Sequence, residues 1–161
     1  MCLLAVTTAL TTTPTAAAAP PERGLLVPGQ SLGGLRLGLT KGQVKARWGK
    51  DFGRCRGCFH ETWYFNYRPF EPQGAGVEFE QGKVRRIFTV WEPSGWRTGS
   101  GLTLGAPADD VTDAHGSLPR KQCLRYTALL LRGPGAITVF YTYDDRLFGF
   151  GLMRAGLAAC V

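Results

Sequence analysis

Acidic side chains and long apolar runs are scarce in this sequence. The 161 residues contain 12 acidic side chains against 19 basic ones, which leaves a formal net charge of +7. Beyond residue 21 there is no apolar run of about 18 residues, so no internal membrane-spanning helix is expected. Glycine, in contrast, is abundant at 22 residues and weakens helix interiors, which argues against an all-helical bundle.

Catalytic signatures are also missing from the sequence. It contains no G-x-S-x-G elbow, Walker loop, H-E-x-x-H or EF-hand pattern. His60 and Glu61 are adjacent in the chain, so on a strand they would point to opposite faces. His115 is expected to pack on a helix face, and the aspartates of 109–113 to complement the positive end of that helix. The sequence therefore predicts a protein without enzymatic activity, bound metal or cofactor.

The first 21 residues carry no charged side chain. An apolar stretch gives way to Thr, Ala and Pro, and Ala16–Ala19 resembles an Ala-x-Ala cleavage site of a secretory signal. The alternative is a disordered leader, because the segment lacks the basic residues with which a signal begins. Export predicts a secreted or extracytoplasmic protein, in which residues 22–33 would form an N-terminal linker.

Four cysteines follow the leader, and an even number in an exported chain indicates two disulfides. Three pairings exist, and we favour Cys55 with Cys58 and Cys123 with Cys160, because each bridge then lies within one half of the chain. In the chain-entropy model, closing a loop of about 37 residues contributes roughly 3 to 4 kcal/mol.

The C-x-x-C motif of Cys55 and Cys58 also allows two more reactive interpretations. A thiol-exchange site is one, and a zinc site that includes His60 is the other. The motif lies in a Gly- and Arg-rich loop before a predicted strand, whereas redox C-x-x-C motifs usually open a helix. We therefore expect a structural disulfide and keep thiol activity as an alternative.

An internal repeat is the most prominent pattern in the chain. The motif G-L-x-L-G occurs at 34–38 and again at 101–105, with an offset of 67 residues. The same offset aligns Val44 with Val111 and Gly49 with Gly116, giving six identities in sixteen positions. Composition alone would give roughly one.

Each copy is expected to begin with a short helix. Thr40 and Gln43 form a capping box in the first copy, with Val44 and Trp48 on one helix face. In the second copy Pro107 suits the first helical turn. Alternation then predicts strands at 62–67, 77–80 and 84–91, and at 124–131, 137–143 and 147–153.

These elements predict an α+β fold made of two tandem repeats, 34–95 and 96–161. Each repeat would pack a short helix on an antiparallel sheet of about three to four strands. Residues 92–100, rich in Gly, Ser and Pro, would form the joining loop.

The order of motifs resembles a known superfamily. In the first copy G-L-x-L-G, T-x-x-x-V, W-G, the aromatic run Trp63–Phe65 and V-x-F-x-x-G-K-V follow one another. This order resembles the superfamily that contains the beta-lactamase inhibitor protein and the small lipoprotein of the bacterial outer-membrane assembly machinery. The second copy lacks the paired aromatic strand and the Gly-Lys hairpin. The resemblance implies α+β repeats that bind proteins or envelope components without catalysis, and sheets that join into one concave surface.

Aromatic and basic side chains provide the candidate binding site. Tyr, Trp and Arg dominate protein-binding hot spots. We expect one sheet face, opposite the helices, to present such residues to a protein partner: Tyr64, Arg86, Trp91, Trp96, Tyr141 and Tyr143. Recognition of an anionic envelope polymer or lipid is the alternative. Nucleic acid is not an expected partner, because no nucleic-acid-binding motif is present.

Overall fold

The chain forms an α+β fold around one large antiparallel sheet. The computed structural model describes residues 20–65 and 74–160, so the predicted leader, apart from its last two residues, lies outside the described part, as do positions 66 and 67 of a predicted strand. The large sheet has eight strands in the spatial order β3 (Gly53–Arg54), β4 (Glu61–Phe65), β5 (Gly74–Glu80), β6 (Lys83–Val90), β11 (Arg146–Arg154), β10 (Ala136–Tyr143), β9 (Thr127–Arg132) and β8 (Arg120–Gln122). It is larger than the separate sheets of three to four strands that the sequence predicted, because β6 pairs with β11 and joins the two halves.

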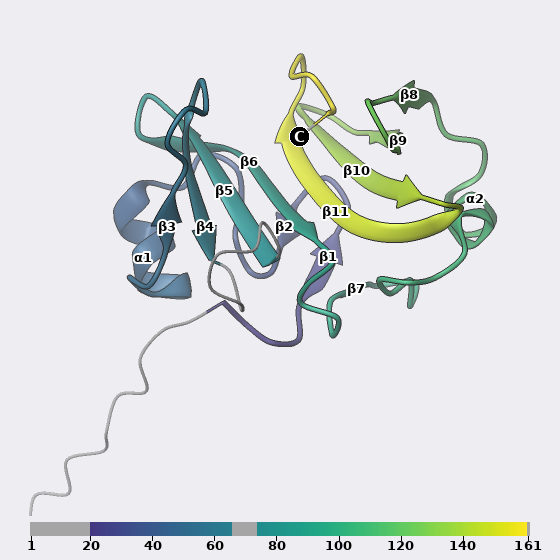
Figure 1. Ribbon diagram of the computed structural model, residues 1–161, viewed down its shortest axis with the longest axis horizontal. Helices are drawn as coiled ribbons and strands as arrows, with labels where there is room; N and C mark the ends of the chain where they lie inside the picture. Colours follow the sequence, from purple (N-terminus) through teal and green to yellow (C-terminus); the bar gives the residue numbers. More distant parts are fainter. Residues whose placement is uncertain (1–19, 66–73, 161) are drawn as a thin grey trace, which may run out of the picture.

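Two helices cover one face of this sheet, near its two ends. They are α1 (Lys41–Trp48) and α2 (Ala108–His115), and Figure 1 shows them on opposite sides of the molecule. Their buried residues belong to one hydrophobic cluster with Phe65, Phe140 and Phe150 of the sheet. We call this side of the sheet the helix face and the opposite side the outer face.

The predicted capping box of α1 is confirmed. The Thr40 hydroxyl accepts a hydrogen bond from the Gln43 N–H at 3.3 Å, and the Gln43 side-chain oxygen accepts one from the Thr40 N–H at 2.9 Å. Val44 and Trp48 are the buried residues of the helix, as their spacing predicted. In α2, Pro107 occupies the cap position and provides no side-chain hydrogen bond.

The segments before the two helices are attached to the sheet in the same way. Gly38 N–H donates to the Val84 carbonyl, and Val84 N–H donates to Leu39, both at 2.8 Å. In the second half, Gly105 N–H donates to the Leu147 carbonyl at 2.6 Å and Leu147 N–H donates to Ala106 at 2.8 Å. Gly38 and Gly105 are separated by the 67-residue offset of the sequence motif.

The two stretches that the sequence predicted as connecting segments are instead folded parts of the core. Residues 22–33 contain β1 (Leu25–Val27) and β2 (Ser31–Leu32), and residues 92–100 contain β7 (Arg97–Thr98). These strands form a three-stranded sheet in the order β2-β1-β7, placed between the two helices in Figure 1. Leu26 and Leu32 are fully buried, which explains why this segment cannot be a free linker.

One predicted strand begins later than expected. The pattern at 124–131 predicted a strand from Leu124, but β9 begins at Thr127. Residues 123–126 form a tight turn between β8 and β9, closed by a hydrogen bond from the Cys123 N–H to the Tyr126 carbonyl at 2.9 Å. Leu124 consequently lies at the tip of this turn and not in the sheet.

Candidate protein-binding surface

The outer face, where the sequence placed the binding site, is mostly closed by its own hydrophobic cluster. Buried side chains from both halves of the sheet and from the C-terminal segment pack together there: Phe88, Cys123, Ala128, Leu130, Ile137, Val139, Tyr141, Phe148, Met153 and Ala159. The face is therefore a second core over much of its area, and few of its aromatic rings reach solvent.

The C-terminal segment is fastened to this face by a disulfide and by an arginine. Cys123 and Cys160 are bonded, as the sequence analysis favoured, with their Cα atoms 5.6 Å apart. The Arg86 guanidinium donates hydrogen bonds to the carbonyls of Ala158 and, at 3.4 Å, of Cys160. Arg86 is buried, so its expected role as a partner-contacting residue is wrong: it holds the end of the chain.

A β-bulge turns two consecutive arginines to the outer face. Glu78 faces Arg86 across the β5–β6 pair and Phe79 faces Val84, so Arg85 is the extra residue of β6. A bulge lets neighbouring side chains share one face, and Val84 and Ile87 on either side both pack on the helix face. Arg85 pairs with Glu78 at 3.0 Å, and Arg86 pairs with the same carboxylate at 3.4 Å.

The ion pairs continue across the junction of the two halves. Arg85 contacts Glu80 at 2.9 Å and the His60 imidazole, and Arg154 of β11 contacts the other oxygen of Glu80. Because Arg85 and Glu78 are largely shielded from water, removing one of these charges would leave its partner uncompensated. The network is a structural connection between β5, β6 and β11.

Tyr141 is also part of the core, so its predicted role in partner contact is wrong as well. Its ring lies against the backbone of β11, where a Cβ added at Gly151 would come within 2.8 Å of the Tyr141 hydroxyl oxygen. The ring is fully buried, and this burial raises the pKa of the Tyr141 hydroxyl. Phe88 lies over Gly76 in the first half in the same manner.

Trp96 lies on the other side of the sheet. Its ring is fully buried among Gly24, Gly33 and Trp48, and its indole N–H donates to the Pro21 carbonyl at 2.7 Å. A Cβ at Gly33 would lie 2.2 Å from this ring, so only glycine fits. Trp96 therefore joins the N-terminal segment to the core and is not available to a partner.

Of the six predicted binding residues, Trp91 and Tyr143 are the two whose rings reach far into solvent. They are 52% and 48% exposed, and their centroids are 6.4 Å apart in an edge-on arrangement. The Trp91 ring also packs against the Phe148 ring, with their centroids 5.2 Å apart, and the backbone N–H of Trp91 donates a hydrogen bond to the Phe148 carbonyl at 2.7 Å. Tyr64 is half-buried against Phe88, and burial raises the pKa of its hydroxyl.

The backbone at Trp91 is unusual for so large a residue. Its φ is 61°, in the left-handed region that favours glycine. Strained backbone of this kind persists where the surrounding structure enforces it, and it is concentrated at functional sites. We call Trp91 and Tyr143, supported by Phe148, the aromatic pair.

The C-x-x-C motif forms the second disulfide, Cys55–Cys58, in the loop between β3 and β4. The motif does not open either of the two described helices. Within residues 20–65 and 74–160 there is no cluster of three or more His, Cys, Asp or Glu side chains that could hold a metal ion. Two disulfides are typical of proteins that fold in an oxidising compartment. None of the helices in the described part of the chain is long and apolar enough to cross a bilayer.

Two exposed apolar residues were missed by the sequence analysis. Phe59 and Leu124 are almost completely exposed, and each follows a disulfide-bonded cysteine directly. Their position directly after Cys58 and Cys123 is the signal that could have identified them.

Comparison with known proteins supports the fold and no more than the fold. No protein-family model and no curated protein matches the chain. Among solved structures, it is similar to an extracellular protein containing an SCP domain from Bacillus anthracis, with a TM-score of 0.54 and 11% identity over 94% of this chain and 50% of that one. The chain thus spans about half the length of that protein.

Two further solved structures are more distant. They are a cysteine-rich secretory protein from Staphylococcus aureus (TM-score 0.48, 10% identity, 87% of this chain and 49% of that chain) and a DUF4309 family protein from Bacillus subtilis (TM-score 0.46, 12% identity, 71% of this chain and 78% of that chain).

Proposed function

We propose that this chain is a non-catalytic binding protein that acts outside the cytoplasm and recognises another protein through the aromatic pair. The observation that carries the proposal is the half-exposed Trp91–Tyr143 pair, held on a buried base of aromatic rings. Trp and Tyr dominate binding hot spots because they bury a large area and lose few rotatable bonds. A rigid base adds to this, since side chains that are already ordered lose less entropy on binding.

The proposed location rests on the two disulfides together with the predicted secretory leader. Disulfides form and persist in secreted and periplasmic proteins and are rare in the cytosol. Both bridges lie in loops or turns at the sheet edges, and one of them also fastens the C-terminal segment.

The architecture supports a duplicated scaffold of the kind that the superfamily resemblance implies. Each half supplies one helix and four consecutive strands, and the two sets meet at β6 and β11 in mirrored order. The matching hydrogen bonds of Gly38 with Val84 and of Gly105 with Leu147 agree with the sequence offset. We propose that the halves are tandem repeats and that the chain belongs with the beta-lactamase inhibitor protein and the small assembly lipoprotein.

The proposal is tested by affinity capture with the purified, oxidised protein as bait. Culture supernatant and envelope extract of the producing organism are passed over wild-type protein and over a Trp91→Ala/Tyr143→Ala variant, and the retained proteins are identified by mass spectrometry. The partner is then purified and titrated against both baits. We expect the double variant to bind the partner at least about 30-fold more weakly than wild type, as for hot spots worth about 2 kcal/mol.

A matched control is Leu25→Ala, because Leu25 is an exposed apolar residue on β1 at 44% exposure. This variant is expected to retain the partner fully. If the double variant and wild type retain the same protein with equal affinity, the aromatic pair is not the binding site and the proposal fails.

A further inference from the structure

The first and last strands of the large sheet each lead into a disulfide-anchored loop with an apolar side chain at its tip. Phe59 follows Cys58 in the β3–β4 loop and is 96% exposed. Leu124 follows Cys123 in the β8–β9 turn and is 95% exposed. We call these the two tips. Single exposed apolar residues are common on protein surfaces, but these two occupy corresponding positions, each directly after a disulfide-bonded cysteine.

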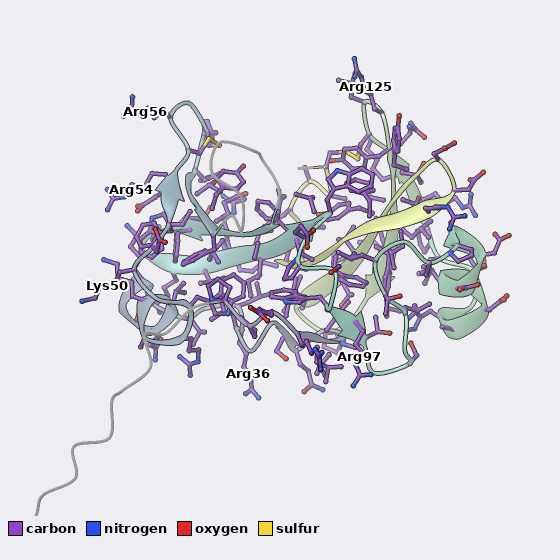
Figure 2. All side chains as sticks on the ribbon, turned by 60° about the horizontal axis from the view of Figure 1, so that its bottom comes forward. Arg36, Lys50, Arg54, Arg56, Arg97 and Arg125 are labelled. Carbon is purple, nitrogen blue, oxygen red and sulfur yellow. A yellow bond between two sulfur atoms is a disulfide. The ribbon has the colours of Figure 1, made fainter. Side chains whose placement is uncertain are left out.

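An unpaired arginine accompanies each apolar side chain. Arg56 and Arg125 are exposed, and neither forms an ion pair with any residue within 20–65 and 74–160. Arg54, on β3, is exposed close to the first tip. Figure 2 shows Arg56 and Arg125 projecting from the same side of the molecule, well apart, while Arg36 and Arg97 project from the opposite side.

Both tips are held on rigid supports. The first is closed by the Cys55–Cys58 bond and by a hydrogen bond from the Cys55 N–H to the Thr62 carbonyl at 3.0 Å. The second is closed by the Cys123–Tyr126 hydrogen bond and joined to the C-terminus through Cys160. β3 and β8 are the two edges of one sheet, so both tips are attached to the same body, and Figure 2 shows Arg56 and Arg125 projecting from the same side of it.

The chemistry of the tips fits a lipid surface better than a protein. Protein hot spots lie in packed patches surrounded by other side chains that exclude water. Leu124 is 95% exposed, and Phe59, whose ring meets the edge of the His60 ring at 4.7 Å, is 96% exposed. A single apolar residue that enters the acyl boundary, with cations at the level of the headgroups, is the pattern of interfacial attachment. The net charge of +7 favours an anionic surface.

We propose that the two tips dock this protein on an anionic lipid bilayer, with Phe59 and Leu124 inserted and Arg56 and Arg125 at the lipid phosphates. This attachment uses neither residue of the aromatic pair. The pair lies near the second tip, because Phe148 contacts both Trp91, at 5.2 Å, and Tyr126 of the β8–β9 turn, at 5.4 Å.

Cosedimentation with vesicles tests the proposal. Oxidised full chain is mixed with vesicles of phosphatidylcholine alone and with vesicles of phosphatidylcholine and phosphatidylglycerol in equal parts. We expect binding to the phosphatidylglycerol vesicles only, weakening as salt rises. Arg56→Gln/Arg125→Gln should lower the partition coefficient about fivefold for each arginine. Phe59→Ala/Leu124→Ala should lower it at least about tenfold at unchanged charge.

The matched control is Arg36→Gln/Arg97→Gln, which removes the same charge from the opposite side and should weaken binding much less. Trp91→Ala/Tyr143→Ala should bind vesicles like wild type, which separates this proposal from the proposed function. The docking proposal is overturned if the oxidised protein binds neither vesicle, if Phe59→Ala/Leu124→Ala binds like wild type, or if the control loses as much as Arg56→Gln/Arg125→Gln. The last two outcomes would mean that net charge alone attracts the protein.

Discussion

The two halves of the molecule each supply one helix and four strands of the large sheet, but they are stabilised by different chemistry. At the position where α1 ends in the buried Trp48, α2 ends in the half-buried His115. Where Thr40 caps α1 with its side chain, Pro107 offers α2 none. The first half has a disulfide that spans three residues, and the second has one that spans 37. The comparison teaches that the same order of one helix and four strands can be stabilised by different interactions.

Replacing the two helix-end residues should give the largest contrast. The Trp48 ring contacts Phe65 at 5.3 Å and Trp96 at 5.7 Å, and its indole N–H donates to Gly33 at 2.8 Å. Trp48→Ala should lower the free energy of unfolding by about 3 to 5 kcal/mol. His115→Ala should lower it by about 1 kcal/mol, because the ring packs mainly on Phe140. Urea unfolding of both variants measures the difference, and equal losses would contradict the comparison.

The two disulfides should differ in the same unfolding measurement. In the chain-entropy model, removing the long Cys123–Cys160 bridge costs about 4 kcal/mol and removing the short Cys55–Cys58 bridge about 2 kcal/mol. Paired Cys→Ser variants provide the test. If removing the short bridge lowers the free energy of unfolding more than removing the long one, the short bridge stabilises more of the fold than its own loop.

The helix caps should give a smaller contrast. Thr40→Ala removes the hydroxyl of the capping box and should cost about 1 kcal/mol. Pro107→Ala removes no cap hydrogen bond, so it should cost only about 0.5 kcal/mol through greater freedom of the unfolded chain. The free energies of unfolding of the two variants, measured side by side, decide whether the caps differ as described.

The smallest expected effect is on the pH dependence of stability, to which His115 contributes and Trp48 does not. Burial lowers the pKa of His115 below its ordinary value of 6.5. The folded protein then binds fewer protons than the unfolded chain, so stability falls as pH drops from the ordinary value toward the folded one. The His115→Gln variant should lose this part of the pH dependence. A steeper slope in the variant than in wild type would contradict the assignment.

Much of this fold could be predicted because its signals are local. The capping box at Thr40, the spacing of Val44 and Trp48, and the alternation along β5 and β6 each depend on neighbours in the sequence. The favoured disulfide pairing also followed from the position of the cysteines in the two halves, and both bridges are present.

The remaining features depend on contacts between distant residues. Leu26 and Leu32 are too few to make a strand pattern, and their strands exist because Trp96 packs beside them. Burial of Tyr141 depends on the small residue at Gly151 of the next strand, which no pattern within β10 reveals. The identity of a residue as Tyr, Trp or Phe therefore could not distinguish the rings that reach solvent from those that fill the core.

The division between exposed and buried rings is tested most directly with one variant, Trp91→Gly. Glycine adopts a φ of 61° without steric cost, so the variant removes the ring while suiting the backbone. We predict a free energy of unfolding within about 1 kcal/mol of wild type, together with loss of the captured protein partner. A variant that is strongly destabilised but still binds that partner would contradict the account.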